Sequence, residues 1–256
     1  MTLHLIGLGL SDEKDITVKG LETIKRCKYI YLENYTGTLQ CTKESLEKFY
    51  GKPITEASRD LMENRSAELL NNSKDDDVAV LVIGDPMAAT THISLLMEAK
   101  EKGIKVNIIH NASILTAIGI TGLQLYKFGK TTSIPFTAET EDVEVPYTII
   151  KENQEINAHT LVLLDLNPEE KRFLTVSKAL DILLRCEKRK GASILNEQTH
   201  IIALAGIGSD NQVIKAGSIA ELLKWNVSIY PQSLIIPAKT LHFVEEEAMN
   251  MWDNGE

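Results

Sequence analysis

The chain has 256 residues, of which 43% are hydrophobic and 25% charged, a composition typical of globular proteins that bury a core without disulfides or metals. Its formal net charge of -9 argues against nucleic acid as the main ligand, because phosphate binding depends on a basic surface. No apolar run approaches the ~20 residues that span a bilayer, and no secretory signal pattern precedes the first strand-like segment. We therefore expect a cytoplasmic protein that binds neither nucleic acid nor membrane.

The first half of the chain alternates strand-like and helix-like segments. Apolar runs predict strands at 3–9, 29–32, 78–83 and 106–110, with a weak strand near 53–55. Helical spacing predicts helices at 16–27, 43–50, 58–72 and 89–102, with Ser58 as an N-cap and Thr90 and Thr91 as capping hydroxyls. This alternation is typical of a parallel, doubly wound sheet with right-handed crossovers.

The apolar residues of two of these helices are spaced to face the core. In the first helix they are Val18, Leu21, Ile24 and Cys27. In the last they are Ile93, Leu96 and Met97.

The second half of the chain begins less regularly. The segment 133–146 holds two prolines and several acidic residues with little periodicity, so a domain junction is expected upstream of it or within it. Strands are then predicted at 161–164, 201–205 and 233–236, and a helix at 175–190. The run Glu245-Glu246-Glu247 is interpreted as a solvated helix face. We expect an α/β fold of two domains, residues 1–112 and 113–256, joined near 112–135.

The motif Gly7-Leu8-Gly9 follows the first predicted strand. A dinucleotide fingerprint would need a third glycine at position 12, which is Asp12, so a nicotinamide oxidoreductase is disfavoured. The two glycines are expected to allow a tight turn and the approach of a ligand to the backbone, although a purely structural turn is the alternative.

The turn Gly84-Asp85-Pro86 follows the most apolar predicted strand. Ligands of open α/β sheets bind at the carboxyl ends of strands, which makes this turn a candidate site. Its carboxylate can accept hydrogen bonds from hydroxyl or amino groups, or balance a cation. Such turns are also common as purely structural elements.

Other catalytic patterns are missing from the sequence. The histidines lack metal-ligand spacing, so they are interpreted as structural and no metal is expected. No nucleophile elbow supports a hydrolase.

Several longer strings resemble the diphthine synthase family of the tetrapyrrole methylase superfamily. They are 6–10, 15–22, Gly84-Asp85-Pro86, Ala89-Thr90-Thr91-His92, 110–114 and 119–129. The resemblance implies two α/β domains with S-adenosylmethionine in a cleft between them, a homodimer, and methylation of the modified histidine of translation elongation factor 2. By position it implies donor contacts at Leu10, Asp85, Ala88, Ser113, Ile114, Leu164, Ile207 and Gln232, and assigns no catalytic side chain.

The chain departs from the family pattern at three places. Gln232 stands where the family often has histidine, Gly206 stands where it commonly has arginine, and 136–146 lacks a tryptophan. These departures leave open a donor-binding homologue with impaired catalysis, and a methylase of small tetrapyrroles is a further alternative.

Overall fold

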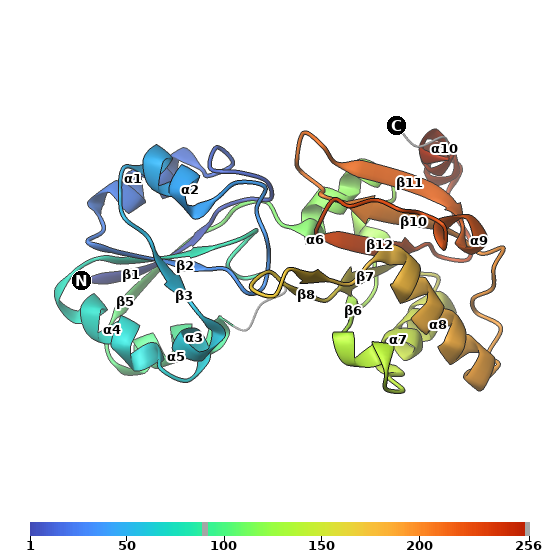
Figure 1. Cartoon of the computed structure of the whole chain (residues 1–256), viewed down its shortest axis with the longest axis horizontal. Coiled ribbons are helices and arrows are strands. Elements are labelled where there is room, and N and C mark those ends of the chain that lie inside the picture. Colours follow the sequence, from blue (N-terminus) through green and yellow to red (C-terminus); the bar gives the residue numbers. More distant parts are fainter. Residues whose placement is uncertain (89–91, 254–256) are drawn as a thin grey trace. The chain divides into compact units, whose positions relative to one another are not determined.

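The computed structural model describes residues 1–88 and 92–253. The chain forms two compact units, Met1–Leu115 and Thr116–Glu256, each built on its own five-stranded sheet (Figure 1). The domain division expected between residues 112 and 113 stays a prediction, because compactness alone does not define a folding unit. Among the described residues, no helix has the length and apolar character needed to cross a membrane.

The first unit contains the parallel sheet that the alternating pattern predicts. Its strands are β1 (Thr2–Gly7), β2 (Tyr29–Glu33), β3 (Thr55–Ala57), β4 (Val78–Val82) and β5 (Lys105–Ile109). They lie in the order β3-β2-β4-β1-β5, and every neighbouring pair is parallel. The carboxyl ends of all five strands therefore lie along one edge, where open α/β sheets bind ligands.

Helices cover both faces of this sheet. On one face lie α1 (Val18–Arg26) and α2 (Lys43–Tyr50). On the other lie α3 (Arg59–Glu63), α4 (Ser66–Asp75) and α5 (Ile93–Glu101). Residues of β4 alternate between the two cores, with Ala79 and Leu81 in the first and Val80 and Val82 in the second. Burial on both faces explains why this strand is a continuous apolar run.

The predicted helix at 58–72 is wrong, because the chain forms two helices there. Ser58 caps α3 as expected, its hydroxyl accepting the Leu61 N–H. The helix ends at Glu63, and Arg65 pairs with Asp60 in α3 and with Glu68 in α4.

The predicted core faces of two helices are also partly wrong. On α5, Ile93 and Met97 are 55% and 59% exposed, whereas Leu95 and Ala99 are buried. This helix has apolar residues on several sides, so their spacing did not identify the face that packs on the sheet. On α1, Val18 is exposed, and Ile24 and Cys27 are buried. The predicted capping residues Thr90 and Thr91 lie outside the described residues.

The second unit has a mixed sheet. Its strands are β6 (Thr132–Ile134), β7 (Thr160–Leu164), β10 (His200–Ala205), β11 (Val213–Ser218) and β12 (Gln232–Ile236), in the order β11-β10-β12-β7-β6. The β6–β7 pair is parallel, and the other three pairs are antiparallel. A short hairpin of β8 (Leu166–Asn167) and β9 (Arg172–Phe173) follows β7.

The helices of the second unit include several that the sequence did not predict. The predicted helix is confirmed as α8 (Val176–Lys190), which buries Val176, Ala179, Leu180 and Leu183 in the core. The unpredicted ones are α6 (Ile114–Ala117, which begins in the first unit), α7 (Val145–Glu155), α9 (Ile219–Leu222) and α10 (Phe243–Trp252). The short turns η1 (Ile118–Thr121), η2 (Leu125–Lys127) and η3 (Phe136–Glu139) complete the unit.

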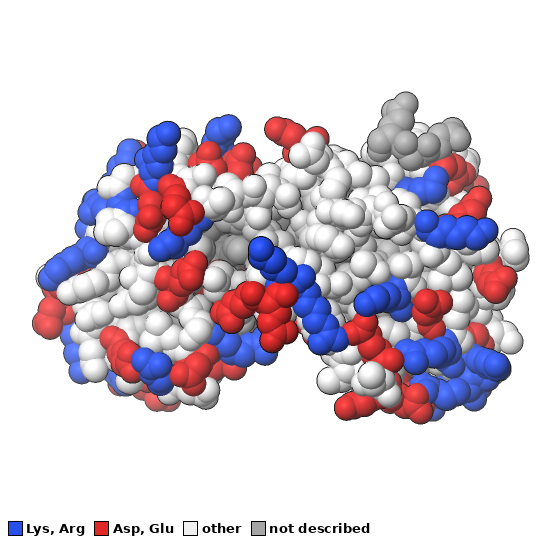
Figure 2. Space-filling view, in the orientation of Figure 1, with Lys and Arg blue, Asp and Glu red and all other residues white. Residues whose placement is uncertain are grey.

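The acidic segment at 139–144 pairs with basic residues of the same unit. Glu139 forms ion pairs with Arg172 and with Lys178, whose Nζ lies 2.9 Å away, and Glu144 pairs with Lys190 at 2.6 Å. On the face shown in Figure 2, Lys and Arg side chains are interspersed with Asp and Glu. Charges on this face therefore form no broad basic stripe of the kind that nucleic-acid binding uses.

Candidate active site

Three loops meet at the carboxyl edge of the first unit's sheet. They follow β1, β4 and β5. Gly9 and Gly84 form an antiparallel bridge in which the Gly84 N–H donates to the Gly9 carbonyl at 2.7 Å. The Asn111 side-chain amide donates to the carbonyls of Gly7 and Asp15, both at 3.0 Å. These bonds tie the loops after β1, β4 and β5 into one surface.

Leu10, a predicted donor contact, lies half-buried in the first of these loops. The Asp15 carboxylate accepts the backbone N–H groups of Leu10 at 3.1 Å and Ser11 at 2.7 Å. Asp15 therefore fixes the backbone of this loop by a side-chain contact that spacing could not predict.

The glycines of this edge differ in what surrounds them. A Cβ on Gly7 would lie 2.6 Å from the Gly84 carbonyl and 2.8 Å from Asn111 Cβ. Protein atoms fill that space, so the structure favours the structural reading of Gly7 over ligand approach. Gly84 is different, because a Cβ there would meet no heavy atom closer than 3.8 Å, apart from its own chain neighbours. A Cβ at Gly84 would therefore fit in ordinary van der Waals contact with Ala112 and Ser113.

Asp85 follows Gly84 and is held by its neighbours. Its Oδ1 accepts the Met87 N–H at 2.8 Å, and its Oδ2 accepts the Asn111 N–H at 3.0 Å and lies 2.8 Å from His110 Nδ1. Burial raises the pKa of Asp85, but the Met87, Asn111 and His110 hydrogen bonds outweigh it and hold this pKa below its ordinary value. Asp85 is therefore a fixed carboxylate that stays ionised.

The remaining predicted contacts of the first unit lie around this carboxylate. Ala88 closes the turn, with its N–H donating to the Asp85 carbonyl at 3.2 Å. Ser113 is 7% exposed, and its Cβ lies 3.9 Å from the position that a Cβ of Gly84 would take. Ile114 begins α6. Four of the eight predicted contacts thus lie in the loops that meet at this edge, and a fifth, Ile114, lies at the start of the following helix.

Leu164, Ile207 and Gln232 lie at or near the same end of three neighbouring strands, β7, β10 and β12, in the second unit. Gln232 pairs with Ala205 at the end of β10, and Ser233 pairs with Leu163. The ends of β7 and β10 therefore lie beside the start of β12. The sheet register brings together three predicted residues that are far apart in the sequence.

The Gln232 side chain is engaged with the backbone around it. Its Oε1 accepts the Val176 N–H at the start of α8 at 2.9 Å, and its Nε2 donates to the carbonyls of Val227 at 2.7 Å and Ile229 at 3.2 Å. The N-terminal N–H groups of a helix have no partner within it, so Gln232 satisfies one of them. The donor contact predicted at Gln232 stays a prediction.

Gly206 adopts a conformation that suits no arginine. Its φ is +59°, and a Cβ would lie 2.5 Å from Ile229 Cγ2. The packing of Ile229 therefore accounts for glycine at this position.

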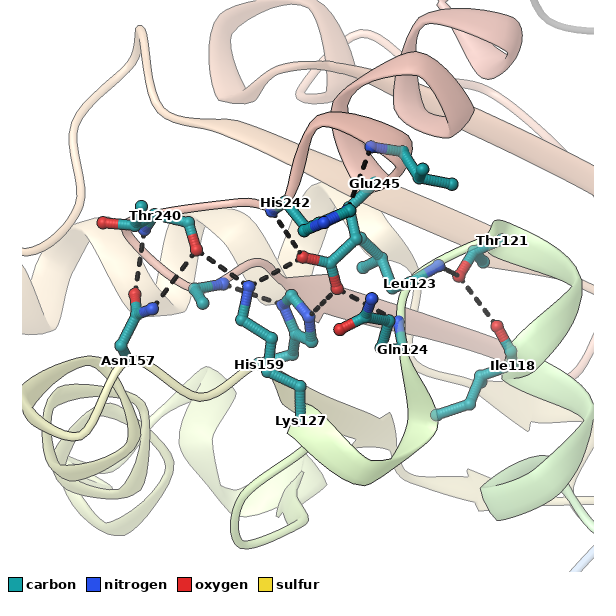
Figure 3. Close-up of polar contacts among 12 residues, drawn as sticks. Ile118, Thr121, Leu123, Gln124, Lys127, Asn157, His159, Thr240, His242 and Glu245 are labelled. Carbon is teal, nitrogen blue, oxygen red and sulfur yellow. Dashed lines mark hydrogen bonds and ion pairs between the residues drawn. The ribbon is translucent and has the colours of Figure 1, made fainter.

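A buried polar network lies at the other end of strands β7 and β12 (Figure 3). It shows that the run Glu245-Glu246-Glu247 is not wholly a solvated helix face. Glu245 is fully buried and accepts hydrogen bonds from His159 Nε2 at 2.8 Å and Lys127 Nζ at 2.7 Å. It also accepts the N–H groups of Gln124 at 3.1 Å and His242 at 2.9 Å. Glu246 and Glu247 are exposed as predicted, so only part of the run is solvated.

The hydrogen-bond donors around His159 and Glu245 determine the protonation states of these two side chains. The Ala238 N–H donates to His159 Nδ1 at 2.9 Å, so the proton of His159 is on Nε2 and faces Glu245. Burial lowers the pKa of His159, which stays neutral. Burial raises the pKa of Glu245, but hydrogen bonds from His242, Lys127, Gln124 and His159 bring it down to about 2. We interpret this network as structural, since it anchors α10.

The sequence model of the tetrapyrrole (corrin/porphyrin) methylases matches residues 2–223. The chain therefore belongs to this family of methyltransferases, and its reaction uses a methyl donor.

Relatives within the family cover almost the whole chain. A diphthine synthase of Methanococcus aeolicus is 46% identical, over 96% of this chain and 95% of its own. A diphthine methyl ester synthase of Yarrowia lipolytica is 44% identical, over 95% of this chain and 86% of its own. A crystal structure of diphthine synthase superposes with a TM-score of 0.91 at 36% identity, covering 99% of this chain and 96% of that one.

Two residues of the site were not predicted as such: His110 was interpreted as a structural histidine, and Asn111 was given no role. Both stand in a string that carried the family resemblance. Their position at the carboxyl end of a predicted strand was the available signal. The hydrogen bonds to Asp85 and to the loop after β1 become evident only in three dimensions.

Proposed function

We propose that this chain transfers methyl groups from S-adenosylmethionine to the modified histidine of translation elongation factor 2 in diphthamide biosynthesis. The observation that carries this proposal is the fixed, ionised Asp85 in the turn after β4, at the carboxyl end of the strand. It occurs in a member of the methylase family whose near full-length relatives are named for diphthine.

The residues around Asp85 fit the proposed donor. Asp85 Oδ1 accepts one N–H and has capacity for a donor hydroxyl or ammonium group. Its negative charge also suits a cationic ligand. We propose further donor contacts at Leu10, Ala88, Ser113, Ile114, Leu164, Ile207 and Gln232.

When bound, S-adenosylmethionine supplies a methyl group on a sulfonium, which is activated for in-line displacement. Alignment of the acceptor with the methyl group then accounts for much of the rate. Residues such as Asp15 and Asn111, which hold the loop backbones by hydrogen bonds, supply the rigidity that alignment requires.

The acceptor of the proposed reaction has two groups that accept methyl. One is an amine, which must lose a proton before it attacks, and the other is a carboxylate, which is already ionised near neutrality. Relatives named for diphthine and for its methyl ester are both compatible with this chemistry. The mass increment on the acceptor gives the number of methyl groups.

The proposed activity is tested by incubating the chain with S-adenosylmethionine labelled in its methyl group. The acceptors are elongation factor 2 carrying the unmethylated diphthamide intermediate, elongation factor 2 with unmodified histidine, and a tetrapyrrole. Label in the first protein alone supports the proposal. Label in the tetrapyrrole would favour a small-molecule methylase, and donor binding without transfer to any acceptor would favour an impaired homologue.

We also propose that the chain works in the cytoplasm as a homodimer. The homodimer is what the family resemblance implies, and Tyr126 and Leu125, which are 85% and 42% exposed on the surface of the second unit, are candidate interface residues. Sedimentation equilibrium tests this state, and a monomer at micromolar concentration would contradict it.

A further inference from the structure

His110 and Asp85 form a side-chain pair at the carboxyl edge of the first unit's sheet. His110 follows β5 and Asp85 follows β4, and the parallel register of both strands with β1 brings their ends together. The distance from His110 Nδ1 to Asp85 Oδ2 is 2.8 Å. The His110 side chain is 68% exposed, whereas that of Asp85 is 11% exposed. The pair thus has a fixed, buried end and an accessible end.

The surroundings of Asp85 determine which nitrogen of His110 carries the proton. Asp85 is ionised and accepts hydrogen bonds from the Met87 and Asn111 N–H groups. An ionised carboxylate only accepts hydrogen bonds, so His110 Nδ1 is the donor. In the neutral ring, Nε2 then carries a lone pair, and the described part of the chain gives it no partner.

We propose that His110 Nε2 is the base that takes the proton from an amine acceptor before methyl transfer, with Asp85 orienting the ring. This inference rests on the proposed function. Carboxylate-held imidazoles act in this way in other enzymes, where the carboxylate fixes the tautomer and stabilises the imidazolium that forms.

The proton and the electron pair of this step are both accounted for. The N–H bond of the acceptor ammonium breaks, and its proton forms a bond with His110 Nε2. The imidazolium, next to the Asp85 carboxylate, then releases this proton to water. The free amine nitrogen forms a bond to the methyl carbon as the carbon–sulfur bond breaks and its electron pair stays on sulfur. Each methylation of the amine thus releases one proton, while methylation of the carboxylate releases none.

Among the described residues, the charged group in contact with His110 is Asp85. Asp85, on the loop after β4, faces the imidazole directly. Asp15, on the loop after β1, directs its carboxylate to the N–H groups of Leu10 and Ser11 instead. Asp85 thus orients the His110 ring through the Nδ1–Oδ2 contact.

The inference is tested with His110→Gln, which keeps an N–H for Asp85 but supplies no base. His200→Gln is the matched control, since His200 Nε2 pairs with Asp253 at 3.1 Å and lies at the start of β10, opposite the end that carries Ile207. Methylation rates are measured from pH 6 to pH 10 with the amine acceptor, and donor affinity by calorimetry. Thermal unfolding confirms that each variant is folded.

We expect His110→Gln to lower kcat for amine methylation about 100-fold near neutral pH, with donor affinity within about threefold of the wild type. The loss should shrink as pH rises, because hydroxide and the free amine population replace the missing base. Imidazole in the buffer should restore part of the rate to His110→Ala. His200→Gln should match the wild type throughout.

Two results would overturn the inference. One is an unchanged rate at every pH, and the other is an equal loss at every pH without rescue by imidazole, which would assign His110 a structural role. If His110→Gln fails to fold, the rescue of His110→Ala decides between these roles. Failure of the proposed function itself gives a different result, because the wild type would then methylate nothing.

Discussion

The Asp85 side chain has a structural role, and we propose that it also contacts the donor. Its Oδ2 joins the loops after β4 and β5 through His110 and Asn111, while its Oδ1 accepts the Met87 N–H alone. The motif Gly84-Asp85-Pro86 therefore shapes the turn and leaves carboxylate capacity for a ligand. The two readings of the motif, as a structural turn and as a donor site, are compatible.

Asp85→Ala should weaken S-adenosylmethionine binding about 10- to 100-fold, because hydrogen bonds to a charged group contribute about 1.5–3 kcal/mol. Isothermal titration calorimetry measures the affinity. Glu56→Ala, at an exposed position of β3, is the matched control and should bind as the wild type does. Unchanged affinity in Asp85→Ala would mean that the turn is only structural.

The backbone at the end of β1 lies close to the Gly84 carbonyl and to Asn111. Gly7 permits this close packing because it has no side chain. Gly7→Ala should destabilise the first unit by about 1–3 kcal/mol, the usual effect of overpacking, since backbone atoms cannot easily move aside. Chemical denaturation followed by circular dichroism measures the loss. Gly119→Ala is the control, because its Cβ would meet Leu125 at 3.4 Å, close to an ordinary contact. Equal losses in the two variants would contradict this packing argument.

Helix α10 is held by the buried carboxylate of Glu245. Glu245→Gln should destabilise the second unit by roughly 3 kcal/mol at pH 7, because Lys127 and His159 lose their charged partner in a buried setting. Both tryptophans, Trp225 and Trp252, lie in this unit, so their fluorescence during urea unfolding measures the effect there. Glu246→Gln, one residue along and exposed, should change little. Equal stability of the two variants would contradict the stabilising role of the Glu245 network.

The same carboxylate predicts how acid acts on the second unit. The pKa of Glu245 is lowered from 4.5 to about 2 in the folded protein. A lowered folded pKa gives stability that is complete above the unfolded value and is lost as pH falls through the folded value. Wild-type stability should therefore decline more steeply between pH 4.5 and pH 2 than that of Glu245→Gln. Parallel pH profiles from tryptophan fluorescence would contradict the assignment.

Sequence patterns predicted the elements whose burial follows a simple period. β4 is buried on both faces and α8 on one stripe, and both were predicted close to their bounds. The pattern failed for α7, where Pro146 in the first turn suggested a loop and where the buried face includes Asn153 and Gln154. It also failed at Glu245, whose partners come from distant segments. Polar contacts between residues far apart in the sequence produce no periodic pattern in it.

At the scale of the whole molecule, the sequence predicted two α/β units and placed eight candidate residues by resemblance. Four lie in the loops at the carboxyl ends of the first unit's strands, Ile114 starts the following helix, and three lie at one end of the second unit's strands. The chemistry of His110 was not predicted, because its partner Asp85 stands 25 positions away. Strand order brings these two residues together, and strand order is a property of the fold.

The central claim, methylation of elongation factor 2, is tested most directly by mass spectrometry. The chain is incubated with S-adenosylmethionine and elongation factor 2 that carries the unmethylated diphthamide intermediate, and the peptide with the modified histidine is fragmented. We predict methyl-sized mass increments on that histidine side chain. An unmodified peptide, with the donor bound and the protein folded, would contradict the claim.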